Sequence, residues 1–407
     1  MKKNLFFLFF IIFIDTLGIG ILIPIVPQIL GDPTSAYYLL SPEQKDLGFF
    51  LLGLLVASYP VEVFFAAPIL GALSDKYGRK PILVVSILGT SISYFVFAYA
   101  IFTQNIPLLF LSRIFDGITG GNISVAQAAI ADLTSRENRT RNYGMMGSVF
   151  GLGFIFGPFL GGVLSSPAVH SSFDVSTPFI FSGILALCSA VFLTFFFKES
   201  IIEKARERKI NLLASFYNIA KANKFSSLRF LFVVSLLFSL GITFYTSFFN
   251  VYLTNKFGFS AADIGAFFAY VGVCIIFTQL FIVGAIAKRF SEIEILGPAY
   301  LASGIMIAAF LVPNIAWQVI LIVPIAAIPH GLQHANFISL LTKKADPDML
   351  GEVLGVQSSI SSIGQALPPI FAGSLAAIFA PGMPIFISAL FIISAGIIFI
   401  KKVKPYA

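Results

Sequence analysis

The sequence predicts an all-α membrane protein with twelve transmembrane helices in two six-helix halves. Its 407 residues are 57% apolar and only 11% charged, whereas soluble domains average about 45–50% and about 25%. The Lys and Arg residues behind the net charge of +7 lie in short clusters between long apolar runs. This pattern is typical of cytoplasmic loops between membrane helices, and it excludes a soluble globular protein, a disordered chain and a nucleic-acid-binding protein.

A helix that crosses a bilayer needs roughly 20 mainly apolar residues. Stretches without Asp, Glu, Lys or Arg supply most of the helices, and turn signals at Pro313-Asn314 and at 381–384 divide the two longest stretches. The predicted spans are near 5–30, 48–73, 82–102, 106–131, 142–165, 177–197, 228–253, 263–287, 294–313, 316–341, 352–379 and 382–400. We expect the first to be a retained membrane helix, because it has no small-residue cleavage pattern.

The charges of the loops predict the orientation of the chain. If both termini lie in the cytoplasm, most of the 26 Lys and Arg residues fall in cytoplasmic segments, and only Lys45 and Lys256 lie outside. Positive residues concentrate on the cytoplasmic side of membrane proteins. We therefore expect a multi-pass protein of the cell (inner or plasma) membrane with both termini in the cytoplasm.

The two halves of the chain resemble each other. Gly144, Gly153, Pro158 and Gly162 each have a counterpart 211 residues later, at Gly355, Gly364, Pro369 and Gly373. Such a repeat is typical of an alternating-access transporter, with its site at the midplane between the halves. The predicted units are residues 1–197, a cytoplasmic linker at 198–227, and residues 228–407.

The linker allows two interpretations. It can hold a short amphipathic helix on the membrane surface, with Leu212, Leu213, Phe216 and Ile219 as its apolar face. It can equally be a solvated connection whose positive charges face the cytoplasm.

Several motifs resemble those of a known family. Residues 71–81, with the sequence GALSDKYGRKP, are similar to the loop signature of the major facilitator superfamily. The glycine-rich run 147–162 resembles the fifth-helix motif of its twelve-helix drug:proton antiporters. Asp15, Asp132 and the segment Arg113–Gly120 are similar to the tetracycline-efflux branch. The resemblance covers the whole chain and implies the major facilitator fold.

The resemblance also implies a proton-coupled antiporter that exports small amphipathic compounds, cations among them, by alternating access. The implied partners are a small-molecule substrate, protons and the lipid bilayer. The implied protein is a monomer without cofactor, metal, nucleic acid or enzymatic activity. A symporter or uniporter of the same fold, importing a sugar, a peptide or an organic ion, is the alternative. A membrane enzyme or receptor would need a nucleophile, a base or a metal cluster at one membrane face, and the sequence suggests none.

The loop between the second and third helices is a candidate latch. By resemblance, Gly71, Asp75, Gly78, Arg79 and Lys80, together with Asp132, hold the halves together when the inner side is closed. Asp75, Arg79 and Lys80 can form charge-assisted bonds across the inner mouth. A plain positive anchor on the cytoplasmic side is the alternative.

The fifth helix carries glycines at four-residue spacing, Gly153, Gly157 and Gly161, which permits tight contact with another helix. Pro158 frees a backbone carbonyl and favours a bend. The resemblance implies that this contact seals the pathway against leak, and ordinary packing is the alternative.

Ionisable residues within the predicted spans are the strongest indication of a site. Each charge costs on the order of 3 kcal/mol at the centre of a membrane helix, so such residues face a cavity or a partner. Arg113 and Asp116 share a helix face and are expected in the substrate cavity. Asp15 and Glu62 are expected to carry the proton. A buried structural ion-pair network is the alternative.

The tenth helix contributes the other expected cavity residues, His330, Gln333 and Asn336. His330 and His334 share a face, as metal ligands often do, but no acidic residue accompanies them on that helix. A hydrogen-bonded histidine lining the cavity is therefore favoured over a metal site. Tyr59 and Tyr94 are among the aromatic residues that can form a wall for an apolar or cationic ligand.

Overall fold

The computed structural model describes residues 2–134, 139–200, 213–345 and 349–403, and every regular element within these ranges is a helix. The first half contains α1 (Lys2–Val26), the π-helical turn η1 (Pro27–Gly31), η2 (Pro42–Gln44), α2 (Lys45–Tyr77), α3 (Arg79–Phe102), α4 (Ile106–Gly120), α5 (Asn122–Asp132), α6 (Arg139–Leu164) and α7 (Thr177–Phe196). Then follow α8 (Ala214–Lys221), η4 (Ala222–Lys224), α9 (Arg229–Phe257), α10 (Ala261–Phe277), η5 (Thr278–Val283), α11 (Gly284–Ala287), α12 (Glu292–Ala309), α13 (Ala316–Lys344), α14 (Leu350–Ile378) and α15 (Met383–Val403).

The predicted all-helical membrane fold is confirmed. Each predicted span coincides with one helix or with consecutive helices, as in the run α10–η5–α11. Within the described ranges, nine helices are long and apolar enough to cross a bilayer, and a shorter apolar helix covers Val149–Leu164. The fourth predicted span differs, because it breaks at Gly121 into α4 and α5.

Local sequence signals explain where the helices begin and end. The side chain of Asn105 accepts a hydrogen bond from the backbone N–H of Leu108 at 3.0 Å and so caps α4. Ser260 and Ser291 form capping boxes with acidic residues three positions later, at the starts of α10 and α12. Between α2 and α3, Gly78 adopts a φ of 110°, which favours glycine.

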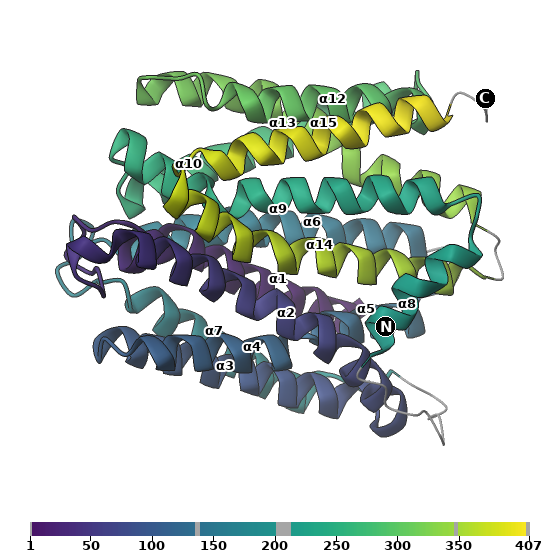
Figure 1. The fold of residues 1–407 in the computed structure, drawn as a ribbon. Coiled ribbons are helices and arrows are strands. Elements are labelled where there is room, and N and C mark those ends of the chain that lie inside the picture. Colours follow the sequence, from purple (N-terminus) through teal and green to yellow (C-terminus); the bar gives the residue numbers. More distant parts are fainter. Residues whose placement is uncertain (1, 135–138, 201–212, 346–348, 404–407) are drawn as a thin grey trace.

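The helices pack into two groups that meet along two helix pairs. In the first group α1 contacts α6, and α3 contacts α4 and α7; in the second, α9 contacts α14 and α15, and α12 contacts α13 and α15. Contacts between the groups are made chiefly by α2 with α14 and by α6 with α10. In Figure 1 most helices of the first group, purple to blue, lie below those of the second, green to yellow.

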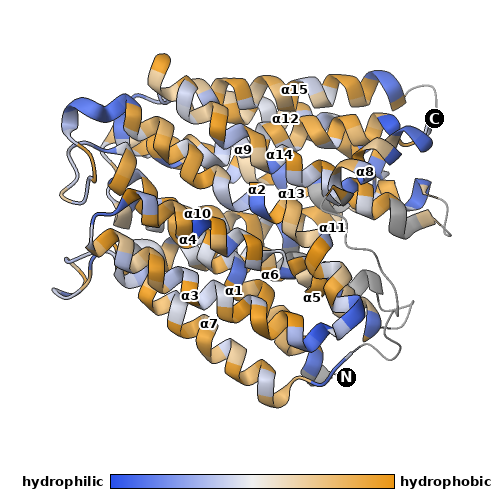
Figure 2. Ribbon diagram, turned by 60° about the horizontal axis from the view of Figure 1, so that its bottom comes forward, coloured by the Kyte–Doolittle hydropathy of each residue, from blue (hydrophilic) through white to orange (hydrophobic). Residues whose placement is uncertain are grey.

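The two ends of the helix bundle carry different parts of the chain. Both termini lie at one end, on the right in Figure 1, together with α8; we call this the terminal end. The connections 32–44 and 165–176 lie at the other, which we call the hairpin end. Figure 2 shows hydrophilic residues gathered at both ends and hydrophobic residues along the helices between them.

Large apolar side chains cover the outside of the bundle between its two ends. Val273 of α10 is 62% exposed, Ile92 of α3 is 53% exposed, and Leu390 of α15 is 50% exposed. An apolar surface of this extent is characteristic of a protein that is surrounded by lipid. The outward-facing residues therefore agree with the membrane fold.

The linker helix α8 lies against α2 and α14. The Ser215 hydroxyl donates a hydrogen bond of 2.7 Å to the backbone carbonyl of Phe64 in α2. Pro68, four residues after Phe64, has no N–H to donate to that carbonyl. On the other side, the Asn218 amide donates to the hydroxyl of Ser359 in α14 at 3.4 Å.

The predicted apolar face of the linker is only partly used in this contact. The ring of Phe216 packs on Phe64, with 5.0 Å between ring centroids, but its side chain stays 45% exposed, and Leu213 is 50% exposed. Leu212 lies outside the described residues. The contacts of α8 thus depend on its polar residues as much as on its apolar ones.

Candidate functional site

A buried ion pair lies in the first half of the protein. Arg113 and Asp116 are one turn apart on α4, and the Arg113 guanidinium donates a hydrogen bond to the Asp116 carboxylate. Both residues are almost completely buried, with 1% and 2% of their surface exposed. The structure therefore confirms that the two side chains share one helix face and interact.

Aromatic rings surround the guanidinium of Arg113. Its Cζ lies 5.8 Å from the ring centre of Tyr59, 5.9 Å from that of Tyr94 and 5.5 Å from that of Phe97. A cation at such distances is attracted by the electrons of each ring. Tyr59 and Tyr94, expected to form a wall for a ligand, thus enclose the charge of the protein itself.

Asp15 of α1 faces this cluster. It is buried, and its carboxylate is close enough to that of Asp116 for the two charges to repel each other. Asn122, which is completely buried, lies beside Asp15, although no hydrogen bond of good geometry joins the two side chains. Sequence reasoning missed Asn122, because a lone asparagine in a predicted span gives no sign of which helix it faces.

Asn122 is the first residue of α5, directly after the break of the fourth span at Gly121. At Gly121 the backbone of α2 comes so close that an added Cβ would lie 2.9 Å from the nitrogen of Ala67. The hydroxyl of Ser124 donates to the carbonyl of Ala67 at 3.1 Å and holds the same crossing. The adjacent pair Gly120-Gly121 is the sequence signal from which this close approach could have been found.

Several polar atoms of the cluster are buried without a hydrogen-bond partner in the described part of the chain. These atoms are Oδ2 of Asp15, Oδ1 of Asp116, Nε and Nη1 of Arg113, Oγ1 of Thr90, and both amide atoms of Asn122. Buried polar atoms normally have partners, and each exception requires an explanation. A water molecule, a proton or a bound ligand among these groups would supply the missing interactions.

Glu62 of α2 lies next to the ion pair. Gly117, which follows Asp116, is so close to α2 that an added Cβ would lie 2.6 Å from Cβ of Glu62 and 2.7 Å from the carbonyl oxygen of Tyr59. The structure thus brings together Asp15, Arg113 and Asp116, and it places Cβ of Glu62 beside the helix that carries the ion pair. All four residues belong to the first half.

The glycines of the fifth predicted span contact α1. An added Cβ at Gly153 would lie 2.5 Å from Cβ of Thr16, and one at Gly157 would lie 2.6 Å from the carbonyl of Leu17. At Gly161 it would lie 2.9 Å from the carbonyl of Ile21. Pro158 lies within α6 beside Gly20, where an added Cβ would lie 2.8 Å from its ring. The predicted tight contact therefore exists, and it joins two helices of the same half.

The residues predicted on the tenth span lie on α13 in the second half. The amide of Gln333, completely buried, donates to the carbonyl of Ala299 in α12 at 3.0 Å. Asn336 donates at 2.6 Å to the carbonyl of Leu332 in its own helix. His330 is half-buried on the same helix. The hydrogen bonds of Gln333 and Asn336 thus stay within the second half.

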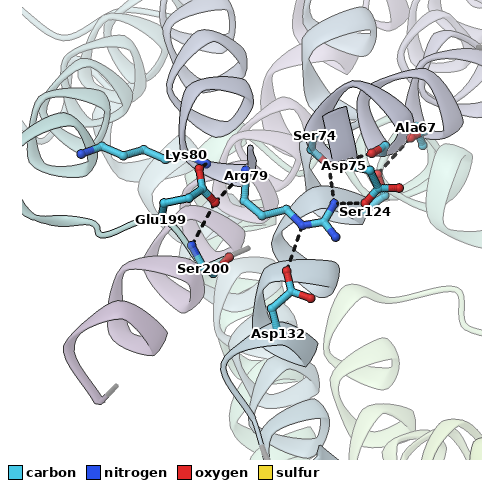
Figure 3. A network of polar contacts seen from close by, with 10 residues as sticks. Ala67, Ser74, Asp75, Arg79, Lys80, Ser124, Asp132, Glu199 and Ser200 are labelled. Atoms are coloured by element: carbon cyan, nitrogen blue, oxygen red, sulfur yellow. Dashed lines mark hydrogen bonds and ion pairs between the residues drawn. The ribbon is translucent and has the colours of Figure 1, made fainter. Parts of the chain in front are cut away.

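The predicted latch residues form a network at the terminal end (Figure 3). Arg79 makes an ion pair of 2.6 Å with Asp75 and one of 3.0 Å with Asp132, and its guanidinium donates to the Ser74 hydroxyl at 2.6 Å. The Lys80 side chain extends away from Arg79. Bonds across the inner mouth were expected, but the bonds of Arg79 join α2, α3 and α5, all within the first half.

Glu199 is a member of this network that sequence reasoning missed. Its carboxylate accepts the backbone N–H groups of Arg79 at 2.9 Å and of Lys80 at 3.2 Å, at the start of α3. An added Cβ at Gly78 would lie 2.4 Å from its oxygen. The first N–H groups of a helix lack partners within the helix and attract negative charge. Gly71 has open space around the position of a Cβ, so no close contact requires a glycine there.

The described residues contain no group of three or more His, Cys, Asp or Glu side chains that could hold a metal ion. Two hollows on the second half are lined mainly by apolar residues. One lies among α9, α14 and α15, and the other among α11, α12 and α13. Neither is lined by the residues predicted for the substrate cavity.

Comparison with known proteins agrees with this architecture. The model of the Major Facilitator Superfamily matches residues 8–369 and, separately, residues 231–406. The tetracycline resistance protein of class H from Pasteurella multocida is 29% identical over 380 residues, which cover 91% of this chain and 88% of that protein. The quinolone resistance protein NorA of Staphylococcus aureus is 27% identical over 383 residues, which cover 92% and 90%.

The solved structure of a human organic anion transporter superposes with a TM-score of 0.73 at 21% sequence identity, and the match covers 98% of this chain and 99% of that one. At this identity the likeness concerns the fold. The family consists of multi-pass membrane transporters, which confirms the prediction that the chain is not an enzyme. On the match of the family model along nearly its whole length, the chain belongs to the Major Facilitator Superfamily.

Proposed function

We propose that this protein is a proton-coupled antiporter that exports small amphipathic compounds, cations among them. The observation that carries the proposal is the buried cluster around Arg113, in which Asp15 and Asp116 outnumber the single guanidinium. An excess of carboxylates that are shielded from water is suited to bind either a proton or a cationic substrate. Two relatives that are named for resistance to tetracycline and quinolone support export of drug-like molecules.

In this mechanism Asp116 neutralises Arg113 for much of the cycle, and Asp15 and Glu62 carry the proton. Asp15 lies about halfway along α1, and Glu62 about halfway along α2, so both reach the middle of the membrane. The substrate binds between the halves, where His330, Gln333 and Asn336 of α13 contribute from the second half. Protonation and substrate binding exclude each other, which couples the two fluxes in opposite directions.

The contacts at the terminal end and on α6 have roles in the conformational cycle. The Asp75–Arg79–Asp132 network stabilises the cytoplasmic face of the first half and engages the second half when that face closes. The glycine contact of α6 with α1 prevents leak. The termini and the 198–227 linker lie in the cytoplasm, and the protein acts as a monomer in the cell membrane.

The test is transport by the purified protein in liposomes, with ethidium as an amphipathic cation. Counterflow of ethidium without a pH gradient establishes exchange. An imposed pH gradient then drives ethidium to the side from which protons leave, if the protein is an antiporter. Counterflow that a pH gradient does not change would favour a uniporter of the same fold, and accumulation in the direction of proton flow would favour a symporter.

A further inference from the structure

A hydrogen bond joins the two halves near the hairpin end. The side-chain amide of Asn250 in α9 donates to the backbone carbonyl of Ile23 in α1. Asn250 is 5% exposed, so the contact lies in the interior between the halves. None of the residues predicted for the site takes part in it.

The carbonyl of Ile23 is available because of a proline. In an α-helix the N–H four residues later binds each carbonyl, but the residue four positions after Ile23 is Pro27, which has no N–H. From Pro27 to Gly31 the chain continues as the π-helical turn η1. The amide of Asn250 therefore takes the place of the backbone N–H that Pro27 lacks.

The orientation of the Asn250 amide is fixed by a second bond. The backbone N–H of Val251 donates to its Oδ1 at 2.9 Å, so the NH₂ group points toward Ile23. Asn255, further along α9, reaches the same region: its amide donates to the carbonyl of Gly31 at 3.4 Å and to that of Val251 at 3.0 Å. Two amides of α9 thus face backbone carbonyls of the α1–η1 segment.

The neighbouring contacts between the halves are apolar and very close. Gly53 of α2 meets Gly373 of α14, where an added Cβ at Gly53 would lie 3.0 Å from Cα of Gly373. Gly162 of α6 meets Gly265 of α10 at the same separation of 3.0 Å. All four glycines lie toward the hairpin end of their helices. Dispersion contacts of this kind have little directional preference, whereas a hydrogen bond fixes one geometry.

We propose that Asn250 and the carbonyl of Ile23 form a latch that holds the hairpin end closed, and that this latch must open in every transport cycle. The inference rests on alternating access as part of the proposed function, in which the halves separate at this end to release substrate outside. Pro27 keeps the carbonyl available for the latch. Asn250 is thus a positioning residue that sets the balance between the closed and the open hairpin end.

The test is a distance measurement by pulsed electron paramagnetic resonance on purified protein with Cys188 and Cys274 changed to serine. Spin labels are placed at Val169 and Val312, which are exposed at the hairpin end of the first and second half. Asn250→Leu should increase the ratio of separated to closed molecules about fivefold, which corresponds to the loss of a hydrogen bond worth about 1 kcal/mol.

Thr243→Val is the matched control. The Thr243 hydroxyl donates to the carbonyl of Ser239 within α9 at 2.7 Å, so this variant removes a similar bond that does not cross between the halves. Its distance distribution should equal that of the parent. Distributions that are the same for Asn250→Leu and the parent, or an equal shift in Thr243→Val, would overturn the proposal.

Pro27→Ala tests the same latch with Asn250 in place. If Asn250→Leu does not fold, this variant alone tests the proposal by the same distance measurement. The new N–H competes for the carbonyl of Ile23 and should shift the distances in the same direction. The double variant should shift them by less than the sum of the single effects, because both act on one bond. Additive effects would contradict the latch. The measurement needs neither substrate nor protons, so its failure is distinguishable from failure of the antiport proposal.

Discussion

Lys343 donates a hydrogen bond to Glu292 at the terminal end of the second half, joining the end of α13 to the start of α12. Arg79 and Asp132 join the start of α3 to the end of α5 in the first half, so the two ion pairs occupy equivalent places. Their charges are reversed: the acid begins the helix in the second half, and the base begins it in the first. Both halves thus bind the same two helix ends together with opposite polarity.

The two ion pairs should differ in their contribution to stability. The Arg79 side chain is 8% exposed and contacts two carboxylates, whereas that of Lys343 is 66% exposed. Arg79→Ala removes the buried guanidinium that two partly buried carboxylates share and should lower the free energy of unfolding by about 3 kcal/mol. Lys343→Ala removes an exposed pair and should cost less than about 1 kcal/mol. Thermal unfolding in detergent compares the two variants. Equal losses would show that the burial of Arg79 does not increase the contribution of its ion pairs to stability.

The Arg113–Asp116 pair gives a prediction with an internal control. Arg113→Leu leaves Asp116 buried without a partner and should lower the free energy of unfolding by about 3–5 kcal/mol. The double variant Arg113→Leu, Asp116→Leu should recover much of this loss, because two apolar residues replace the pair. Denaturant unfolding of the single and double variants provides the comparison. A double variant less stable than either single variant would mean that the pair itself is strongly stabilising.

Much of the fold could be predicted from the sequence, because exclusion of charge from the bilayer is a local property of each segment. The glycine spacing on α6 likewise predicted a close helix contact, because a residue without a side chain allows any neighbouring helix to approach closely. The partner itself, α1 at Thr16 and Leu17, depends on the arrangement of all the helices. The break at Gly121 was missed, although the adjacent pair Gly120-Gly121 marks the place where Ala67 of α2 comes close.

Part of the site could also be predicted from the sequence, because charges are rare within membrane spans. Asp15, Glu62, Arg113 and Asp116 were identified because each charge in a span needs a partner or a cavity. Asn122 escaped notice because a lone asparagine in a span does not indicate which helix it faces, and Glu199 because an acid outside the spans needs no partner. The linker shows a similar limit: its pattern indicated a helix, but Ser215 and Asn218 find their acceptors only in the folded protein.

The position of α8 predicts that the linker moves during transport. Closing the terminal end would bring α2 and α14 together where α8 now contacts both. In protein without its native cysteines, Asn218→Cys with Ser359→Cys should therefore allow a short bifunctional thiol reagent to stop ethidium transport, and each single cysteine treated alike should remain active. A reducing agent that cleaves the cross-link should restore transport. Full activity of the cross-linked protein would mean that α8 stays in place throughout the cycle.

Orientation in the membrane is testable with single cysteines in the protein that lacks its native cysteines. A cysteine at Val169, exposed at the hairpin end, should react with an impermeant thiol reagent in intact cells. A cysteine at Tyr217 of α8, also exposed, should react only after the membrane is permeabilised. The distribution of Lys and Arg between the two ends is the physical reason. Labelling of position 217 in intact cells would reverse the assigned orientation.

Proton coupling through Asp15 and Glu62 is the central claim, and the most direct measurement compares two assays on Asp15→Asn and Glu62→Gln in liposomes. Each variant removes a proton-binding carboxylate and keeps the shape of the side chain. Both variants should fold and should still exchange ethidium down its concentration gradient. Neither should accumulate ethidium against its gradient when a pH gradient is imposed, whereas the parent should. If both neutral variants still concentrate ethidium under the pH gradient, the proton is carried by other groups and this account is wrong.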